Sequence, residues 1–240
     1  MGALGKVHRT YSKFLMRIGR VDADRMESMA EQQKISAVLF DYGMVLSSVP
    51  EDADWRKLEL VLGAGQEKFQ AAYWRYRDAY DRGALSAQTY WETVARDLAK
   101  TMDADVLQAL IDADTVVWTR PNVEMMEWSA RLNRAGIKTG ILSNIGDAME
   151  LGVRGRFPAL DDFTHHTFSH RLGIAKPDAA IYRYAVEGLG VLAGDILFVD
   201  DRKENIEAAR AAGMVAVQYR GHAGFMEEMQ RIGLGWLLRV

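Results

Sequence analysis

A short apolar run, residues 35–40, is the clearest strand signal along the chain. Further strand candidates are residues 138–142, 163–168, 196–199 and 214–219. A short apolar run that is bounded by polar residues and glycine is typical of a strand buried on both faces of a parallel sheet. The pattern therefore predicts a central sheet built from these segments.

Amphipathic stretches with helical spacing separate the later runs, roughly at residues 147–154, 178–189 and 202–212. Strands that alternate with helices form parallel sheets with helices on both faces. We therefore expect the α/β class, with a doubly wound parallel sheet and a Rossmann-like core.

Residues 50–121 interrupt this alternation. They contain no convincing strand, and their apolar positions follow the spacing of three or four helices. Ser86 and Asp103 each precede one of these helices and suit its N-cap. A block of helices inserted after the first strand predicts a second, smaller α-helical domain within the larger one.

The first 34 residues form a further segment. Between residues 11 and 34 apolar side chains recur near helical spacing, so one face of the predicted helix is apolar. Two interpretations stay open, because this face packs either on the same chain or on a second subunit. We accordingly expect an N-terminal helical extension over residues 1–34, and a monomer or a homodimer.

Composition and charge narrow the classes of function. The 240 residues include no cysteine, which excludes disulfides, thiolate metal sites and a thiol nucleophile. The formal net charge of −3 lacks the positive excess of a nucleic-acid-binding protein. No apolar run approaches the ~20 residues of a transmembrane helix, and the N-terminus lacks the apolar stretch of a signal peptide. We expect a cytoplasmic protein with neither a nucleic-acid nor a membrane partner.

Carboxylates follow two of the predicted strands. Asp41 comes directly after the first, and Asp200 and Asp201 come after the fourth. Ligands of open α/β sheets bind outside the carboxyl ends of the strands, although a single aspartate there also suits a loop cap. Adjacent buried carboxylates are costly unless a cation neutralises them, and hard oxygen ligands favour Mg²⁺.

Groups that bind anions follow the other strands. Ser143 and Asn144 end the second run and donate hydrogen bonds to an anionic oxygen. Pro177 suits the first turn of the helix that follows it. Lys176 would then stand at the helix entrance, where its charge and the helix dipole both favour an anion.

Four short motifs together resemble those of the haloacid dehalogenase superfamily, in its order and spacing. They are residues 40–46 (Phe-Asp-Tyr-Gly-Met-Val-Leu), 142–144 (Leu-Ser-Asn), 176–177 (Lys-Pro) and 198–201 (Phe-Val-Asp-Asp), with Asn205 beyond the last. The resemblance implies a core domain of residues 35–49 and 122–240. It also implies a helical cap domain of residues 50–121 between the first two motifs.

The resemblance also implies an Mg²⁺-dependent phosphatase that acts on a small phosphorylated substrate. Asp41 would be the nucleophile and form an aspartyl-phosphate. Mg²⁺ would be bound by the Asp41 carboxylate, the backbone carbonyl of Gly43 and Asp201, with Asp200 as an auxiliary ligand. The residues that would bind the substrate or orient its neighbours are Ser143, Lys176, Asn144 and Asn205.

Gly43 is a departure from the pattern. Phosphatases of this superfamily usually have a second aspartate there, which protonates the leaving group and activates water. Losing such a group typically costs ~10²–10⁴-fold in rate. Three outcomes stay open: the leaving group is an easier one, the cap supplies an acid such as Asp78 or Asp81, or the protein turns over slowly or not at all.

One subgroup of the superfamily shares this glycine. Residues 41–45 and 80–86 resemble bacterial glucose-1-phosphate phosphatases, whose leaving group is an anomeric sugar oxygen. This resemblance implies a sugar phosphate as the substrate.

Three other classes of protein share part of this pattern. A metal-independent 2-haloacid dehalogenase lacks the acidic pair seen at Asp200 and Asp201. A response-regulator receiver places its acidic pair first in the chain rather than last. A binding or regulatory protein that has lost turnover is compatible with Gly43. A histidine metal site is disfavoured, because His165 and His166 point to opposite faces of a strand.

Overall fold

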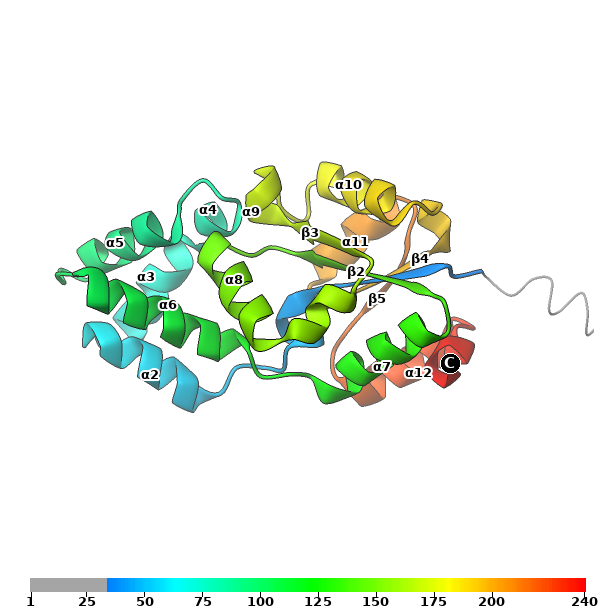
Figure 1. Ribbon diagram of the computed structural model, residues 1–240, viewed down its shortest axis with the longest axis horizontal. Coiled ribbons are helices and arrows are strands. Elements are labelled where there is room, and N and C mark those ends of the chain that lie inside the picture. Colours follow the sequence, from blue (N-terminus) through cyan, green and yellow to red (C-terminus); the bar gives the residue numbers. More distant parts are fainter. Residues whose placement is uncertain (1–33) are drawn as a thin grey trace, which may run out of the picture. The chain divides into compact units, whose positions relative to one another are not determined.

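The computed structural model of the chain describes residues 34–240, drawn in colour in Figure 1. Residues 35–240 make one compact unit. The predicted helix over residues 11–34, and with it the N-terminal extension, lies outside the described residues apart from Lys34. Among the described residues, no helix is long and apolar enough to cross a membrane.

Five parallel strands form the central sheet in the order β3-β2-β1-β4-β5. They are β1 (Ala37–Phe40), β2 (Lys138–Ser143), β3 (His165–Phe168), β4 (Ile196–Asp200) and β5 (Val215–Gln218). Each predicted strand is present, and the α/β class is confirmed. The chain moves outward from β1 to β2 and β3, then returns to place β4 on the other side of β1. The order therefore reverses between β1 and β4, which is where ligands bind in such sheets.

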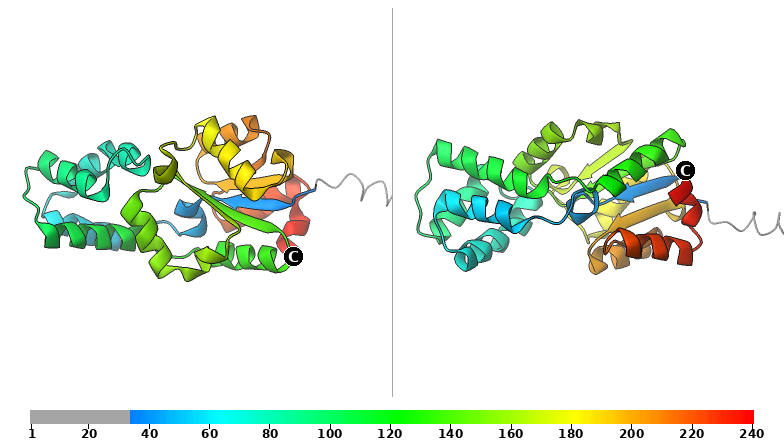
Figure 2. Two further views of the ribbon diagram at one scale, coloured as in Figure 1. Left: turned by 45° about the horizontal axis from the view of Figure 1, so that its top comes forward. Right: turned by 90° about the horizontal axis from the view of Figure 1, so that it is seen from below.

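Helices cover both faces of the sheet, as the doubly wound class requires (Figures 1 and 2). On one face lie α7 (Val123–Arg134), α8 (Asp147–Arg156) and α12 (His222–Arg231), and on the other α10 (Ala179–Leu189) and α11 (Lys203–Ala211). Strand β1 feeds both layers, because Val38 and Phe40 point into the first cluster and Ala37 and Leu39 into the second. All four side chains are fully buried, which fixes the register of the central strand.

Five helices occupy the segment between β1 and α7. They are α2 (Asp52–Leu62), α3 (Gln66–Arg75), α4 (Arg77–Asp81), α5 (Ala87–Asp97) and α6 (Ala104–Trp118). They have an apolar cluster of their own, centred on aromatic side chains. The predicted caps are confirmed, since Ser86 accepts a hydrogen bond from the backbone of Thr89 and Asp103 from that of Val106. The division of residues 35–240 into core and cap domains stays a prediction.

The expectation of three or four helices in this segment is wrong, because a break at Tyr76 divides one of the expected helices into α3 and α4. Tyr76, with φ −110° and ψ −1°, is both the C-cap of α3 and the N-cap of α4. Helix α4 buries Arg77 and Tyr80. The buried Arg77 guanidinium forms ion pairs with the carboxylates of Asp81 and Asp114.

The two chain segments that lead into and out of helices α2–α6 lie side by side. Ser47 and Pro121 form an isolated antiparallel bridge. The backbone of Ser48 donates to the carbonyl of Arg120 over 2.8 Å, and that of Asn122 to the carbonyl of Leu46 over 2.9 Å. The first of these two paired segments begins only a few residues after Asp41.

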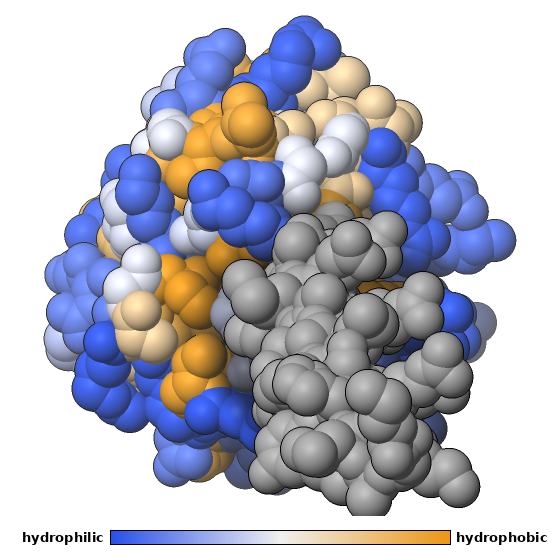
Figure 3. All heavy atoms as spheres, turned by 90° about the vertical axis from the view of Figure 1, so that its right-hand side faces the viewer, coloured by the Kyte–Doolittle hydropathy of each residue, from blue (hydrophilic) through white to orange (hydrophobic). Residues whose placement is uncertain are grey.

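Short elements complete the described chain: η1 (Tyr42–Leu46), η2 (Pro158–Asp162), α9 (Ser169–Leu172), η3 (Ala193–Asp195) and η4 (Gly235–Arg239). The face seen in Figure 3 carries several apolar patches separated by hydrophilic side chains. Large exposed apolar side chains of the described residues include Leu192 on the core and Leu60 on α2. Single exposed apolar residues of this kind are normal on soluble proteins.

Candidate active site

Asp41 stands at the carboxyl end of β1, as predicted. Its backbone N–H donates to the carbonyl of Val199 on β4 over 2.9 Å, so the sheet ladder fixes its position. Its carboxylate accepts a hydrogen bond from the backbone of Tyr42 over 2.7 Å. The residue is 7% exposed, and that exposed part opens into a cavity. Asp41 thus reaches a ligand from a rigid, buried strand.

Three carboxylates gather at this edge of the sheet. Ligand atoms of Asp41, Asp200 and Asp201 all lie within 4.8 Å of one another. Among residues 34–240, this is the cluster of three or more acidic, histidine or cysteine side chains close enough to share a metal ion. The spacing follows from the parallel pairing of β1 with β4, which sets the two strand ends next to each other.

Asp200 is fully buried and surrounded by donors. Its oxygens accept hydrogen bonds from Lys176 Nζ at 2.7 Å, the Arg202 backbone at 2.8 Å and Asn205 Nδ2 at 3.0 Å. Asp201 is less buried than Asp200, and it borders the cavity. Asp200 is therefore placed to hold its neighbours, and Asp201 to reach a ligand.

Lys176 joins two of the acidic groups. Its Nζ lies 2.8 Å from Asp41 Oδ1 and 2.7 Å from Asp200 Oδ2, and its side chain is 2% exposed. Asn144 holds the lysine backbone from both sides, since its Oδ1 accepts from the Lys176 N–H over 2.8 Å and its Nδ2 donates to the Lys176 carbonyl over 2.9 Å. Asn144 was expected to orient a neighbour, and the residue that its side chain contacts is Lys176.

The expected helix entrance at Lys176 is wrong. Helix α10 begins at Ala179, and Asp178 is its N-cap, with its carboxylate accepting from the backbone of Ala180 over 2.8 Å. Pro177 precedes this cap and lies outside the first turn. Because Asp178 caps the helix itself, the end of α10 is not open to an anion, and only the charge of Lys176 would favour one here.

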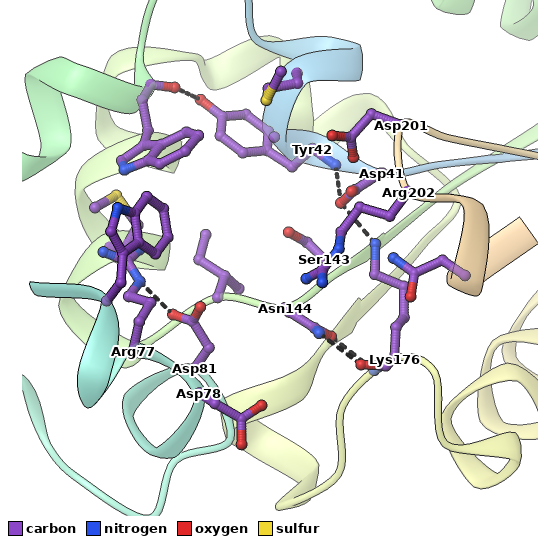
Figure 4. Close-up of a pocket in the computed structure, with 17 residues that line it drawn as sticks. Asp41, Tyr42, Arg77, Asp78, Asp81, Ser143, Asn144, Lys176, Asp201 and Arg202 are labelled. Carbon is purple, nitrogen blue, oxygen red and sulfur yellow. Dashed lines mark hydrogen bonds and ion pairs between the residues drawn. The ribbon is translucent and has the colours of Figure 1, made fainter. Parts of the chain in front are cut away.

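Ser143 ends β2 and borders the same cavity, at 3% exposure. Its strand is paired with β1, so the hydroxyl and the Asp41 carboxylate belong to neighbouring strand ends. The predicted substrate-side residues Ser143, Asn144 and Lys176 are therefore brought together with Asp41 (Figure 4). Asn205 lines the cavity as well.

The charges of this site call for a cation. Burial raises the pKa of Asp41 to about 8 against the pull of Lys176, and Asp200 and Asp201 add to the rise. Burial and Asp200 also raise the pKa of Asp201. Three carboxylates against one lysine leave two negative charges, which a divalent ion such as Mg²⁺ would neutralise. The all-oxygen donor set is the one that Mg²⁺ prefers, so the residues fit that ion.

Gly43 follows Asp41 in the turn at the start of η1. Its backbone, with φ −62° and ψ 129°, is one that any residue adopts. A Cβ placed on it would meet a single neighbour within 4 Å, Cζ3 of Trp118 at 3.9 Å. The position is therefore glycine although neither the backbone nor the space requires it.

Helices α3, α4 and α6 supply the opposite wall of the cavity, whose volume is about 450 Å³. Figure 4 shows Arg77 and Asp81 on that wall, across from Asp41 and Lys176. The side chains that the inserted helices contribute are Trp74, Arg77, Asp78, Asp81 and Trp118.

The sequence reasoning missed Arg77, Trp74 and Trp118. Arg77 lies four residues after Tyr73 and three before Tyr80, on an otherwise aromatic face, and this misplaced charge was the available signal. The two tryptophans carried no such signal, because aromatic residues are equally at home in a small helical core.

The side chains of His165, His166 and His170 do not meet at one site. His165 lies beside Tyr184 of α10, whereas Nε2 of His166 lies 2.7 Å from the carbonyl of Leu160 on the other face of the sheet. His170 pairs with Glu150 at 2.7 Å. The prediction that His165 and His166 point to opposite faces is confirmed.

Comparison with known proteins gives one family and several relatives. The sequence profile described as haloacid dehalogenase-like hydrolase matches residues 27–213. The phosphatase MT3486 of Mycobacterium tuberculosis (strain CDC 1551 / Oshkosh) is 28% identical over 192 residues, which are 76% of this chain and 86% of that protein.

Two solved structures share the fold. A HAD family enzyme of Bacteroides thetaiotaomicron, solved with magnesium and inorganic phosphate, superposes with a TM-score of 0.65 at 18% identity over 78% of this chain and 94% of that one. The L-2-haloacid dehalogenase of Xanthobacter autotrophicus, with chloropropionic acid covalently bound, gives a TM-score of 0.61 at 19% identity over 83% of both chains.

Proposed function

Since this chain belongs to the haloacid dehalogenase-like hydrolases, we propose that it is an Mg²⁺-dependent phosphatase that acts on a small phosphorylated metabolite. One observation carries the proposal. A buried carboxylate, Asp41, lies against Lys176 and inside a cluster of acidic groups, at the open end of the sheet. The phosphatase relative from Mycobacterium tuberculosis supports the same reaction class.

Asp41 is the nucleophile in this proposal. A carboxylate oxygen bonds to phosphorus while the ester oxygen leaves, which gives an aspartyl-phosphate and the free alcohol. Water then attacks the phosphorus, inorganic phosphate departs and the Asp41 carboxylate is restored. Lys176 and the Ser143 hydroxyl border the space beside Asp41, so they would hold the negative oxygens of the transferring group.

Three groups would hold Mg²⁺: the carboxylates of Asp41 and Asp201 and the backbone carbonyl of Gly43. Asp200 would act as an auxiliary group, because its oxygens already serve Lys176 and Asn205. When bound, the ion neutralises the acidic cluster and so lets an anionic substrate approach a carboxylate nucleophile. The magnesium complex of the Bacteroides enzyme supports this assignment.

Residues 50–121 form the cap domain in this proposal, and they close the cavity above Asp41. Phosphate takes only part of a volume of about 450 Å³, so the substrate is a small one. Trp74 and Trp118 offer aromatic faces, and Arg77 and Asp81 offer polar groups, to the rest of the molecule. Such a wall suits a sugar, whose C–H faces pack on aromatic rings and whose hydroxyls bind polar groups.

Phosphate release tests the proposal directly. Purified wild-type protein should release inorganic phosphate from p-nitrophenyl phosphate, and from members of a panel of sugar phosphates, when Mg²⁺ is present. Asp41→Asn keeps the size of the side chain but removes the nucleophilic charge, so it should abolish the release. Excess EDTA should do the same, and added Mg²⁺ should restore it. If wild type and Asp41→Asn release equal amounts over the whole panel, the protein is not a phosphatase.

The dehalogenase neighbour shares the fold, so the same preparation should be tested for it. A metal-independent 2-haloacid dehalogenase would release chloride from 2-chloropropionate in the presence of EDTA. We expect no release, since Asp200 and Asp201 would leave an uncompensated negative cluster beside the carboxylate substrate. A protein that binds phosphate esters but turns none over would instead support the regulatory alternative.

A further inference from the structure

The wall of the cavity formed by the sheet has no carboxyl group left to protonate a leaving group. Asp41 is the nucleophile, Asp201 faces the metal position, and Asp200 is saturated by the donors around it. Position 43, from which the family's acid would act, is a glycine with open space before it. A carboxyl group that gives its proton to the departing oxygen would therefore have to lie on the opposite wall.

Two carboxylates of that wall border the cavity, and they differ in burial. The side chain of Asp81 is 16% exposed, whereas that of Asp78 is 76% exposed. Asp78 is also held from outside, by Arg82 Nε at 2.9 and 3.1 Å from its two oxygens. Asp81 is the one that combines a place in the cavity with shelter from water (Figure 4).

Contacts on both sides hold Asp81 in place. Nε of Arg77 donates to its Oδ1 over 2.9 Å, and Nη1 of Arg77 is anchored in turn by Asp114 at 3.1 Å. The Ser169 hydroxyl binds the backbone carbonyl of Asp81 and also accepts from the Ile145 N–H over 2.9 Å. Ile145 follows Ser143 and Asn144 directly, so α4 is tied to the loop that would bind the phosphoryl group.

We propose that Asp81 is the general acid and base of this hydrolase, in place of the carboxylate that position 43 lacks. The inference rests on the proposed phosphatase function. As the ester P–O bond breaks and the Asp41–phosphorus bond forms, the Asp81 carboxyl gives its proton to the leaving alkoxide oxygen. In the second step the Asp81 carboxylate takes a proton from the water that attacks phosphorus. Inorganic phosphate leaves, and Asp41 returns to its carboxylate form and Asp81 to its acid form.

The electrostatics of the pocket suit this role. Burial raises the pKa of Asp81 to about 6, although Arg77 opposes the rise, and Asp114 and Asp78 add to it. An acid with a pKa near the working pH supplies both protonation states that the two steps need. The charged groups that face Asp81 are Arg77 on its own helix and Asp114 on α6.

Substituting Asp81→Asn tests the inference, because an amide keeps the shape but gives up no proton of this kind. Hydrolysis of 2-glycerol phosphate, whose alkoxide leaves poorly, should fall by roughly 10²-fold in kcat. Hydrolysis of p-nitrophenyl phosphate, whose phenolate needs no proton, should change little. Asp97→Asn is the matched control, since Asp97 also pairs with an arginine of these helices, Arg75, but lies outside the cavity.

The pH profile separates proton transfer from a merely structural effect. With 2-glycerol phosphate, kcat/KM of the wild type should fall as the pH rises through the pKa of Asp81, because the acid form is lost. In Asp81→Asn this limb should be absent, so the ratio of wild-type to variant kcat/KM should fall as the pH rises through the pKa of Asp81.

Restoring the acid at its usual place gives the sharpest test. Gly43→Asp fits the backbone and the open space beside Trp118, so the Gly43→Asp, Asp81→Asn double variant should regain activity on 2-glycerol phosphate. Gly43→Ala combined with Asp81→Asn adds the Cβ without the carboxyl and should not. Rescue by the aspartate alone shows that a missing proton, and not a disturbed fold, caused the loss.

The outcomes separate the two proposals. If the wild type fails to hydrolyse even p-nitrophenyl phosphate, the phosphatase function is wrong and the inference falls with it. If the wild type hydrolyses both esters and Asp81→Asn lowers them equally, or if Asp78→Asn gives the selective loss instead, the phosphatase stands and the role of Asp81 is refuted.

Discussion

Lys176 is the residue whose charge keeps two buried carboxylates together. Its ammonium lies within 2.8 Å of both Asp41 and Asp200. Burial opposes that charge, but the two carboxylates outweigh burial and raise the pKa of Lys176. The lysine therefore stays charged, and it is the counter-charge that is present before any metal binds.

Substituting Lys176→Met should lower the stability of the metal-free protein in a pH-dependent way. Without the lysine, the folded-state pKa of Asp41 rises further above its unfolded value. A group with a raised acid pKa destabilises the fold as the pH increases, because the unfolded state ionises more easily. Removing one partner of a buried pair typically costs ~3–5 kcal/mol.

Urea unfolding in EDTA at several pH values measures this effect. The part of the loss that Asp41 causes should stay constant between pH 5 and pH 7 and grow as the pH rises above about 8, where Asp41 ionises in the wild type but stays protonated in the variant. Lys203→Met is the control, since Lys203 is exposed and pairs only with Glu207 at the surface. A loss that is the same at every pH would contradict the assignment of Lys176 as a counter-charge.

At the scale of single residues, the acidic and basic members of the site were predictable, because each follows an apolar run. Asp41, Ser143 and Asp201 needed only the rule that strand ends meet at one edge of a parallel sheet. Arg77 gave a signal, as a charged residue on an aromatic face, but its partner was not predictable, since Asp114 lies on a helix that begins far along the chain. A buried ion pair between two helices leaves no periodic trace in the sequence.

At the scale of secondary-structure elements, helices α6 and α8 approach each other closely at a glycine. A Cβ on Gly152 of α8 would lie 2.5 Å from both Cγ2 and Oγ1 of Thr115 on α6. Real side chains essentially never come so close, so α6 packs against α8 only because position 152 has no side chain. The same helix carries Gly155, where an added Cβ meets nothing within 4 Å.

The two glycines give a matched pair of variants. Gly152→Ala should destabilise the protein by ~1–3 kcal/mol, because the helices must move apart. Gly155→Ala should stabilise it by roughly 0.5–1 kcal/mol, since alanine is the better helix former at an open position. Thermal or urea unfolding of both variants measures the difference. Equal effects of the two substitutions would show that the contact between α6 and α8 does not hold the helices as described.

Element boundaries illustrate what sequence reasoning misses at this scale. The caps at Ser86 and Asp103 were predictable because a capping side chain is a local signal. Asp178 gives the same kind of signal, but Pro177 suggested a helix whose first turn includes the proline. The structure instead has Asp178 as the N-cap and starts α10 at Ala179. The break at Tyr76 had no local cause, since it serves to bury Arg77 against distant partners.

At the scale of the whole molecule, the acidic cluster links metal binding to folding. An ion that binds only the folded state stabilises it by ~2.7 kcal/mol when its concentration is one hundred times its Kd. Mg²⁺ should therefore raise the Tm of the wild type. Asp201→Asn removes one of the proposed ligands and should remove most of that rise, whereas Asp97→Asn should keep it. Calorimetry with and without Mg²⁺ measures the shift, and a rise of equal size in Asp201→Asn would exclude this residue as a ligand.

The α/β class and the inserted position of the helices were both predictable from the chain's apolar pattern. What the pattern could not give is how the inserted helices face the sheet. That arrangement depends on contacts such as Tyr42 with the Trp118 carbonyl, at 2.8 Å across 76 residues of sequence. Such hydrogen bonds join residues that are distant in sequence, so a local sequence pattern does not predict them.

The paired segments at Ser47 and Pro121 have a consequence for how such a molecule changes. Because the chain leaves the sheet and returns to it at adjoining points, a short turn could join them, and the entropy of closing that turn is small. The continuity of the sheet is thus independent of what lies between the two points. Under the proposed function, we therefore expect that a new substrate preference would require changes only in the inserted helices, while Asp41, Ser143 and Lys176 would keep their places.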